Sequence, residues 1–370
     1  MLVPKTTDVY VSIDITHPQI SKDFKKIAIF TKGNKQSFKT YTYLPDLMVD
    51  FDENTSTYKA AEAIFNQDNA PEAIQVITYT DQVPAPAIQA GTSNAGTKVI
   101  DMNASQSDQP AAGVGRAAFD YFYEDWEIAI LADYNKDDAL ALANVIDNGG
   151  YDGKGFHFML LQFDGSNAGD ASAFDDFKRT FYAYHDVDNE RLDAAWAGEA
   201  TYETIGKRSW KFVHDLNGIT PEPLTATQVN NLERQHFLVY VQKGDHASFT
   251  DDKNAQGLYI DFVHGMDFVK ATVENNLQNS LTLNGKDVFT FDAKGLSAIK
   301  ESITNTLNTA GDQGIVRADS NGKYEFNVDV PDITKIHEST IEHRILEHVK
   351  FNYTASSAIN EIHINGNVVA

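Results

Sequence analysis

Both ends of the chain show a strict alternation of apolar and polar positions, which is typical of strands with one buried face. The first such segment is VYVSIDI and the second is the terminal INEIHINGNVV. Chain termini are more often frayed and polar. We therefore predict two terminal strand arms, over residues 1–20 and 357–370. Their apolar positions are Val9, Val11, Ile13, Ile15, Ile362, Ile364 and Val368.

Apolar runs and amphipathic segments follow the first arm. The runs at 26–33 and 73–80 predict strands, and the segment 55–67 between them predicts a helix. Residues 81–112 are rich in Pro, Gly, Ser and Asn and have weak periodicity, so we interpret them as a loop or a small insertion. This stretch closes the N-terminal part of the core, which we place at 21–110.

The pattern is most regular in the middle of the chain, over 113–245. Apolar runs alternate there with helical segments, which is the pattern of a parallel sheet covered by helices on both faces. Asn135 is placed to cap one helix, and Thr225 with Gln228 predicts a capping box at another. The predicted strands are 126–133, 157–163, 179–185, 210–216 and 237–242.

The C-terminal region, 246–356, predicts an α+β domain. Its elements are helices at about 261–280, 293–309 and 332–350, a hairpin over 281–291 that turns at Asn284-Gly285, a tight turn within 317–326 and a strand at 349–355. The predicted fold class is therefore mixed α/β. It combines a parallel-type sheet with flanking helices, a C-terminal α+β domain and extended arms at both ends.

Composition narrows the classes of function. The chain has 370 residues, a formal net charge of −23 and no cysteine. The lack of cysteine excludes disulfides, thiol catalysis and cysteine-ligated metals. The negative charge disfavours nucleic acid as a partner, because phosphate binding needs a basic surface. With no run of 18 apolar residues and no signal-peptide pattern, we expect no membrane insertion and synthesis in the cytoplasm.

Carboxylates lie where a parallel sheet places active sites, at the C-terminal ends of its strands. Asp133, Asp137 and Asp138 follow the strand at 126–133, and His185 follows another. These groups allow the hypothesis of an α/β hydrolase or metal-dependent phosphoesterase. The competing interpretation is helix capping, since Asn135 and Asp138 precede a helix. The motifs of nucleophile elbows, phosphate loops and zinc proteases do not occur.

Three further groups suggest metals and have simpler interpretations. His185, Asp186 and Asp188 also fit the start of a helix. Asp319, Asn321 and Gly322 resemble a calcium loop, but Val328 stands where its glutamate belongs, so a hairpin turn is favoured. The spacing of the C-terminal histidines suits surface positions better than a zinc site; they are His337, His343, His348 and His363. We therefore predict no catalytic, cofactor-binding or metal-binding residues.

Several stretches, read in order, resemble bacteriophage contractile tail sheath proteins. The resemblance lies in 56–79, where a helix leads through an N-x-P turn to a strand, and in 206–241, where a leucine-containing helix leads to an aromatic strand. The family often has Asn at the position of His236. The resemblance continues through 259–281 and 291–316. It ends with 324–369, a polar helix followed by two strands.

The resemblance implies a structural, non-enzymatic subunit of the virion tail. Such subunits polymerise as a helical sheath around a tail tube and contract to drive the tube through the host envelope. The implied partners are further copies of the chain, the tail tube protein, and the baseplate and tail terminator proteins, with assembly in the host cytoplasm and no cofactor. In the family, a helix before the final strand faces the tube. The matching stretch here is 332–350, with candidate contacts Lys335, Arg344 and Lys350.

The resemblance also explains the two arms. In such sheaths the arms leave their own subunit and add as strands to a neighbour's C-terminal sheet, which is β-augmentation. Pairing of the two terminal strands within one chain remains an alternative. The same sequence also fits a sheath from a phage-derived bacteriocin or injection system, or a non-contractile tail or adhesive component.

Overall fold

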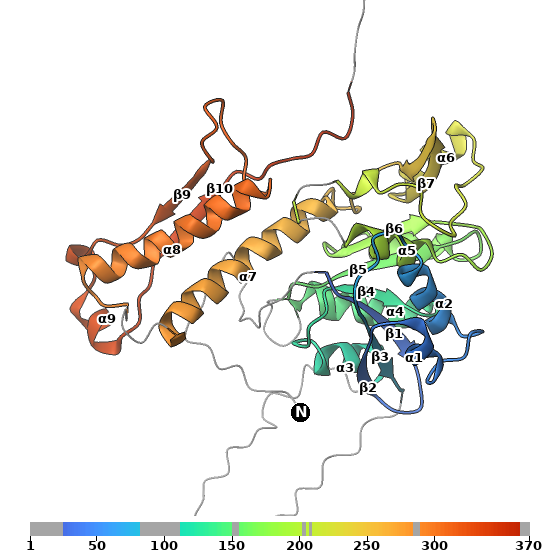
Figure 1. The fold of residues 1–370 in the computed structure, drawn as a ribbon, viewed down its shortest axis with the longest axis horizontal. Helices are drawn as coiled ribbons and strands as arrows, with labels where there is room; N and C mark the ends of the chain where they lie inside the picture. Colours follow the sequence, from blue (N-terminus) through green and yellow to red (C-terminus); the bar gives the residue numbers. More distant parts are fainter. Residues whose placement is uncertain are drawn as a thin grey trace, which may run out of the picture.

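An eight-stranded sheet forms the body of the molecule (Figure 1). The computed structural model describes residues 25–81, 112–149, 155–201, 205–206, 209–283 and 289–362. The strand order is β2-β3-β1-β4-β5-β6-β7-β8; the inner strands run parallel, and β2 and β8 pair antiparallel at the two edges. The strands are β1 (Ile27–Lys32), β2 (Ser37–Tyr41), β3 (Ile74–Tyr79), β4 (Ile128–Leu131), β5 (Phe158–Phe163), β6 (Thr180–Tyr184), β7 (Leu238–Lys243) and β8 (His246–Phe249).

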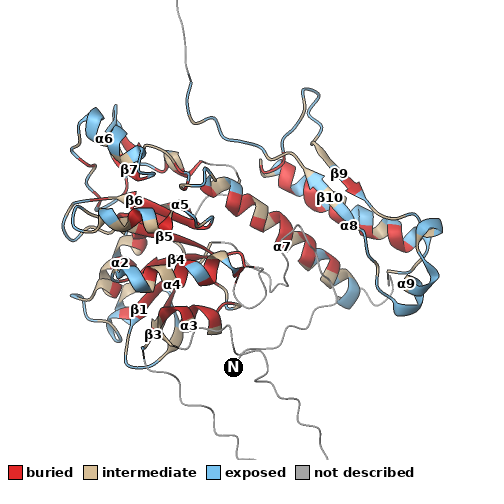
Figure 2. Cartoon of the chain, turned by 180° about the vertical axis from the view of Figure 1, so that it is seen from behind, coloured by how far each residue is buried: buried red, intermediate tan, exposed pale blue. Residues whose placement is uncertain are grey.

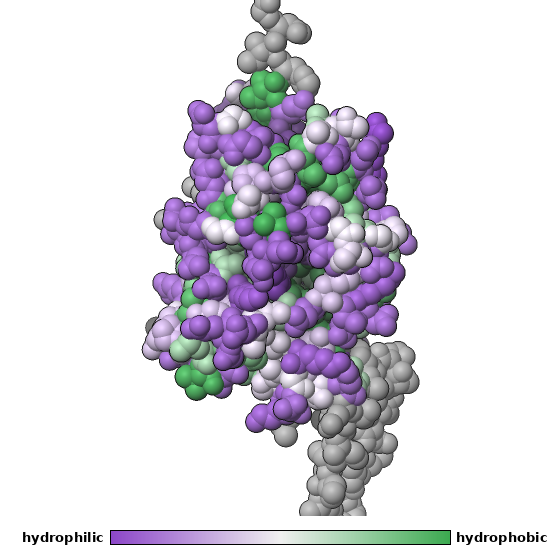
Figure 3. Space-filling view, turned by 90° about the vertical axis from the view of Figure 1, so that its right-hand side faces the viewer, coloured by the Kyte–Doolittle hydropathy of each residue, from purple (hydrophilic) through white to green (hydrophobic). Residues whose placement is uncertain are grey.

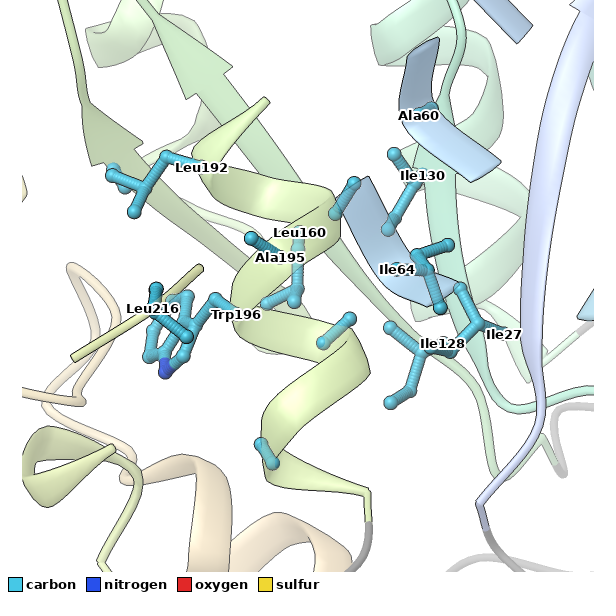
Figure 4. Close-up of a cluster of buried hydrophobic side chains, with 14 of the residues drawn as sticks. Ile27, Ala60, Ile64, Ile128, Ile130, Leu160, Leu192, Ala195, Trp196 and Leu216 are labelled. Carbon is cyan, nitrogen blue, oxygen red and sulfur yellow. The ribbon is translucent and has the colours of Figure 1, made fainter. Parts of the chain in front are cut away.

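Helices cover both faces of this sheet, and each face has its own core. Figure 4 shows one core, in which Ile64 of α2 and Trp196 of α5 lie among side chains of the sheet such as Ile128. Because side chains alternate along a strand, the neighbouring Ala129 faces the second core, with α3 and α4. The helices of the sheet body are α1 (Leu44–Met48), α2 (Ser56–Phe65), α3 (Gly113–Asp120), α4 (Lys136–Asp147), α5 (Leu192–Ala200) and α6 (Ala226–Glu233), with short 3-10 helices η3 (Ala168–Phe174) and η4 (Trp210–Phe212).

Two long helices lead away from the sheet. Figures 1 and 2 show α7 between the sheet body and α8, with α7 largely buried along its length. A third core joins α7 and α8 to a two-stranded antiparallel sheet of β9 and β10. These elements are α7 (Ile260–Leu283), α8 (Ala293–Asp312), β9 (Phe326–Asp329), η5 (Ile333–Lys335), α9 (Glu338–His343) and β10 (Lys350–Tyr353). Within the described ranges, no helix has both the length and the apolar character needed to cross a membrane.

Most elements with a strong periodic pattern are confirmed. The strands predicted at 26–33, 73–80 and 126–133 are β1, β3 and β4, and those at 157–163, 179–185 and 237–242 are β5, β6 and β7. Asn135 caps α4 by accepting hydrogen bonds from the backbone of Asp137 and Asp138, and Thr225 with Gln228 makes the capping box of α6. The predicted mixed α/β class with a largely parallel sheet is confirmed.

The predicted strand at 210–216 is wrong. Ser209 caps the 3-10 turn η4 through the backbone of Lys211, and His214 makes only one isolated bridge, with Ser248. The buried apolar residues are Trp210, Val213 and Leu216. Their spacing of three suits a winding segment on the core surface, whereas a half-buried strand needs a spacing of two.

The predicted hairpin over 281–291 is wrong at its start, because residues up to Leu283 belong to α7. The last α7 residue in the core shared with α8 is Leu277, so the additional turn extends the helix beyond its packed part. Its predicted turn, Asn284-Gly285, lies outside the described residues. The tight turn within 317–326 is confirmed: the backbone of Asp319 and Lys323 pairs across it, and Gly322 has a positive φ of 79°.

Four short elements are not identified by the pattern of the sequence, namely β2, α1, β8 and β9. None has more than six residues, and β2 is an edge strand with only Tyr41 buried. Short edge strands carry many polar side chains, because one of their backbone edges and often one face meet water. The apolar periodicity of the three strands is therefore too weak to identify them, and α1, with five residues, is too short to show a helical period.

Candidate functional site

The edge where β4, β5 and β6 end is the place for catalysis in a sheet of this kind, and a hollow lies there. Asp133, Asp164, His185, Asp186, Glu190 and Arg191 are among its lining residues. His185 is fully buried behind this surface. Its Nε2 lies 3.0 Å from Glu190 Oε2, and its Nδ1 lies 2.9 Å from Glu222 Oε1. Both ring nitrogens thus face carboxylates, and neither is directed at a nucleophile.

Glu190 also ties the hollow to a neighbouring loop. Its carboxylate accepts hydrogen bonds from the backbone and the hydroxyl of Thr220, at 2.6 and 2.7 Å. Burial would raise the pKa of Glu190, but the hydrogen bonds from Thr220 and His185 outweigh it and lower the pKa. Glu190 therefore acts as a fixed anion between His185 and the loop, because a raised pKa would be expected of a general acid.

Arg191 closes the same edge. Its guanidinium donates to the backbone oxygens of Leu131 and Ala132 at the end of β4, both at 2.7 Å, and pairs with Asp193. Burial alone would lower the pKa of Arg191, but the carboxylate of Asp193 raises it. The arginine satisfies strand-end carbonyls that would otherwise need water. This network holds strand ends and α5 together and offers no arrangement for acid–base chemistry.

Two of the three carboxylates predicted as candidate catalysts, Asp133 and Asp138, have structural partners. Ser56 donates to Asp133, and the hydroxyl of Tyr79 donates to Asp138 at 2.8 Å. Asp186 accepts from the backbone of Gly165 at 3.0 Å. The interpretation of 185–190 as the start of a helix is confirmed, because α5 begins at Leu192, but no side chain of this stretch caps it. Gln162 on β5 accepts from Leu192 and supplies the cap instead.

The other suggested metal groups do not converge. The carboxylate of Asp319 accepts hydrogen bonds from the backbone of Asn321 and Lys323 and fixes the turn. His337 caps α9 through Ser339, and His343 contacts the same helix turn. His363 lies outside the described residues. Within the described ranges, the one group of three possible metal ligands is His214, Asp215 and His246, which the sequence analysis missed.

The predicted tube-facing helix at 332–350 is wrong as a single helix. It is divided into η5 and α9, and Arg344 ends α9 in the left-handed conformation with φ 58°. A helix packed on its own domain through Ile336, Ile341 and Ile345 was the alternative to a tube-facing helix. Ile336 is partly buried, but Ile341 and Ile345 are exposed. A helix gains most of its stability from a buried apolar face, so this segment cannot sustain a long one. Figure 2 shows α9 as an exposed element.

The three candidate tube contacts therefore lie on different elements. Lys335 ends η5, Arg344 follows α9, and Lys350 begins β10. All three side chains are exposed. They belong to one surface segment between β9 and β10, but they do not form one helical stripe.

The C-terminal arm is described only up to Ile362, and the remaining arm positions Val9, Val11, Ile13, Ile15, Ile364 and Val368 lie outside the described residues. Residues 357–362 belong to no strand, and Ile359 and Ile362 are 71% and 73% exposed. Asn360 fastens this segment to the sheet body: its backbone oxygen accepts from Lys211 at 3.0 Å, and its amide donates to Asp252 at 3.0 Å.

The face of the molecule in Figure 3 is mostly hydrophilic. This view looks at the sheet body from the side opposite α8 and α9. This hydrophilic character is consistent with the net charge of −23 of the chain and with the exposure of α6, which buries none of its residues. Such a face is suited to contact with water. A face that forms a permanent protein–protein interface usually has a larger apolar area than this one.

The combination of a largely parallel sheet, a long helix pair and a small antiparallel sheet is the fold of contractile sheath proteins. A chain of the anti-feeding prophage baseplate matches with a TM-score of 0.66 at 14% identity, over 100% of both chains. A chain of the contracted sheath complex of PVC, an extracellular contractile injection system, matches with a TM-score of 0.64 at 12% identity, over 99% of this chain and 98% of that one. The sheath tail protein Lin1278 from Listeria innocua matches with a TM-score of 0.55 at 10% identity, over 84% and 89%.

The structural part of the predicted resemblance is thereby confirmed, although no protein-family model and no curated protein matches the sequence. The structure also accounts for the position of His236. This residue follows α6 with a positive φ of 66°. Asn tolerates that conformation better than most residues, which is a physical reason for Asn at this position in sheath proteins.

Proposed function

We propose that this chain is the structural subunit of a contractile sheath in a phage tail or a phage-like particle. The observation that carries the proposal is the match of the entire chain to proteins of such particles, with a TM-score of 0.66. The subunit polymerises around a tube and contracts to drive it through an envelope. Its partners are further copies, the tube protein, and baseplate and terminator proteins. This role needs neither catalysis nor a cofactor.

The β9–β10 sheet supports the proposed exchange of arms. Within the described ranges this sheet has two strands, which is a marginal size for a stable sheet. Val328 on β9 is buried against α7 and α8, whereas Asn327 and Asn352 are exposed, so one face is apolar and the other polar. An added strand with the same alternation continues both faces. Ile362, Ile364 and Val368 have that alternation.

The exposed segment between β9 and β10 is the proposed surface for the tube. The side chains of Lys335, Arg344 and Lys350 are exposed there. Exposed ion pairs contribute only about 0–1 kcal/mol each. Such contacts fit a sheath that must release its tube. Many weak ion pairs repeated along the tail add up to a large binding energy, and this energy is lost when contraction moves the sheath subunits out of register with the tube subunits.

Two finer assignments are part of the proposal. The chains of the anti-feeding prophage and of the PVC injection system match over 99–100% of this chain, and the two sheath tail proteins over 84–87%, so the first group fits the length of the chain better. We also propose the domain boundaries given above, with arms at 1–20 and 357–370. The variable outer region expected at 81–130 is proposed only for the part outside α3 and β4, because these two elements belong to the sheet body.

Electron microscopy of the purified full-length chain tests the proposal. We expect long hollow tubes, and we expect chains that lack residues 1–16 or 357–370 to remain folded monomers. Circular dichroism and size-exclusion chromatography provide the control for folding. Truncated chains that form tubes of ordinary length would refute the role of the arms, and a full-length chain that stays monomeric at high concentration would refute the sheath itself.

A further inference from the structure

We propose that His214, Asp215 and His246 bind a divalent transition metal ion of the zinc class at the outer edge of the large sheet. His246 begins β8, the last strand in the sheet order. His214 bridges to Ser248 of the same strand. The site thus lies between β8 and the segment that follows η4, and none of its three residues lines the hollow at the ends of β4–β6.

The ligand atoms of the three residues converge. One atom from each lies within 4.8 Å of the others. Nδ1 of His214 is 3.2 Å from Asp215 Oδ2, and Nδ1 of His246 is 2.5 Å from the same oxygen. Ligands about 2.1 Å from a tetrahedral zinc ion lie about 3.4 Å apart. Small side-chain rotations therefore place an ion between the three atoms.

The backbone holds the central carboxylate in position. The N–H of Asp215 donates to Ala247 O at 3.1 Å, and the N–H of Ala247 donates to Asp215 Oδ1 at 3.1 Å. One carboxylate oxygen is thus occupied, and Oδ2 is turned to the two imidazoles. Asp215 adopts a positive φ of 51° in this arrangement. Hydrogen bonds that orient a ligand in this way are typical of metal sites.

The donor set selects the class of ion. Two imidazoles and one carboxylate suit zinc and its transition-metal neighbours, whereas calcium and magnesium prefer oxygen ligands. All three side chains are exposed, so an ion enters without opening the fold. It would connect residues 31 positions apart in the sequence and fasten the 214–215 segment to the edge strand. The prediction of no metal ligands was based on motifs of residues that are close in sequence. The group of His214, Asp215 and His246 forms no such motif, because the fold brings its members together from 31 positions apart.

Zinc titration of the untagged full-length protein by calorimetry tests the site, together with its melting temperature in zinc or magnesium. We expect one equivalent of zinc to bind and to raise the melting temperature, because an ion that binds the folded state stabilises it. Magnesium should have no such effect. His246→Ala should weaken zinc binding at least tenfold. Asp215→Asn should also weaken it, while it keeps the Oδ1 acceptor and tolerates the positive φ.

The matched control replaces three other exposed histidines, with His337→Ala, His343→Ala and His348→Ala in one variant. It should bind zinc as the unchanged protein does. Circular dichroism verifies that each variant is folded. We expect His246→Ala to fold, because the side chain of His246 is exposed. Zinc binding that persists in folded His246→Ala, that follows the control histidines, or that is absent from the unchanged protein would overturn the proposal.

Discussion

The guanidinium of Arg179 makes two hydrogen bonds to the carboxylate of Asp267, at 2.7 and 2.8 Å. Arg179 precedes β6, and Asp267 lies on α7, 88 residues away. Both side chains are almost fully buried. Burial alone would lower the pKa of Arg179, but Asp267 raises it. This pair links the sheet body to the helix that leads to the β9–β10 sheet, the region where the arms of neighbours are proposed to add.

Asp267→Asn should therefore destabilise the protein strongly. Removal of one partner leaves the other charge buried without compensation, which costs about 3–5 kcal/mol. The free energy of unfolding from urea denaturation measures this. Asp170→Asn is the control, because its pair with Lys136 is exposed and should contribute less than about 1 kcal/mol. Similar small losses for both variants would contradict a structural role of the buried pair.

Gly198→Ala should separate α2 from α5. A Cβ at Gly198 would lie 2.8 Å from the backbone oxygen of Ile64, a contact that requires the helices to move. Overpacking of this kind costs about 1–3 kcal/mol. Gly169→Ala is the matched control, because its Cβ would meet nothing within 4 Å. Thermal denaturation should show a lower melting temperature for the first variant alone.

Asp261 should make stability depend on pH. Burial, and then the nearby carboxylate of Asp252, raise its pKa from 3.8 to about 6, against the opposing effects of the hydrogen bond from the Phe262 backbone and of His264. The folded state thus holds this proton more firmly than the unfolded chain. The stability contributed by the protonated form is present below about pH 4 and is lost as the pH rises to about 6.

The difference corresponds to at most about 3 kcal/mol. Asp261→Asn removes the titration and keeps an oxygen that can accept from the backbone of Phe262, which donates to Asp261 at 2.7 Å. We expect this variant to be more stable than the unchanged protein at pH 7 and nearly equal to it at pH 4. Parallel stability–pH curves for the two proteins would show that Asp261 is not responsible.

Reversal of two charges tests the proposed tube surface. Lys335→Glu with Arg344→Glu should leave tube-free sheath polymers intact and prevent assembly on purified tail tubes, because the ion pairs with the tube become repulsive. Electron microscopy distinguishes the two kinds of polymer. Lys300→Glu with Lys323→Glu changes the charge equally on exposed residues elsewhere in the same region. Normal assembly of the first variant on tubes would count against this surface.

The sequence by itself determined the elements whose signals are local. The sequence pattern alone identifies β1, β3 and β4–β7 by their apolar runs and α8 by its apolar stripe. Burial on both faces of a strand, or along one face of a helix, determines which neighbouring positions are apolar. The caps at Asn135 and Thr225 were equally readable, since donor and acceptor lie within three residues of each other. The predicted fold class followed from these elements alone.

Only the tertiary structure decided the features that join distant segments. The cap of α5 comes from Gln162, 30 residues before Leu192, and the His214–Asp215–His246 group exists because β8 bridges to the segment after η4. The stretch 332–350 has a helical pattern, but within the described ranges Ile341 and Ile345 are not covered, and the helix ends at Arg344. A pattern along the chain records which residues are apolar, whereas burial depends on which other segments lie against them.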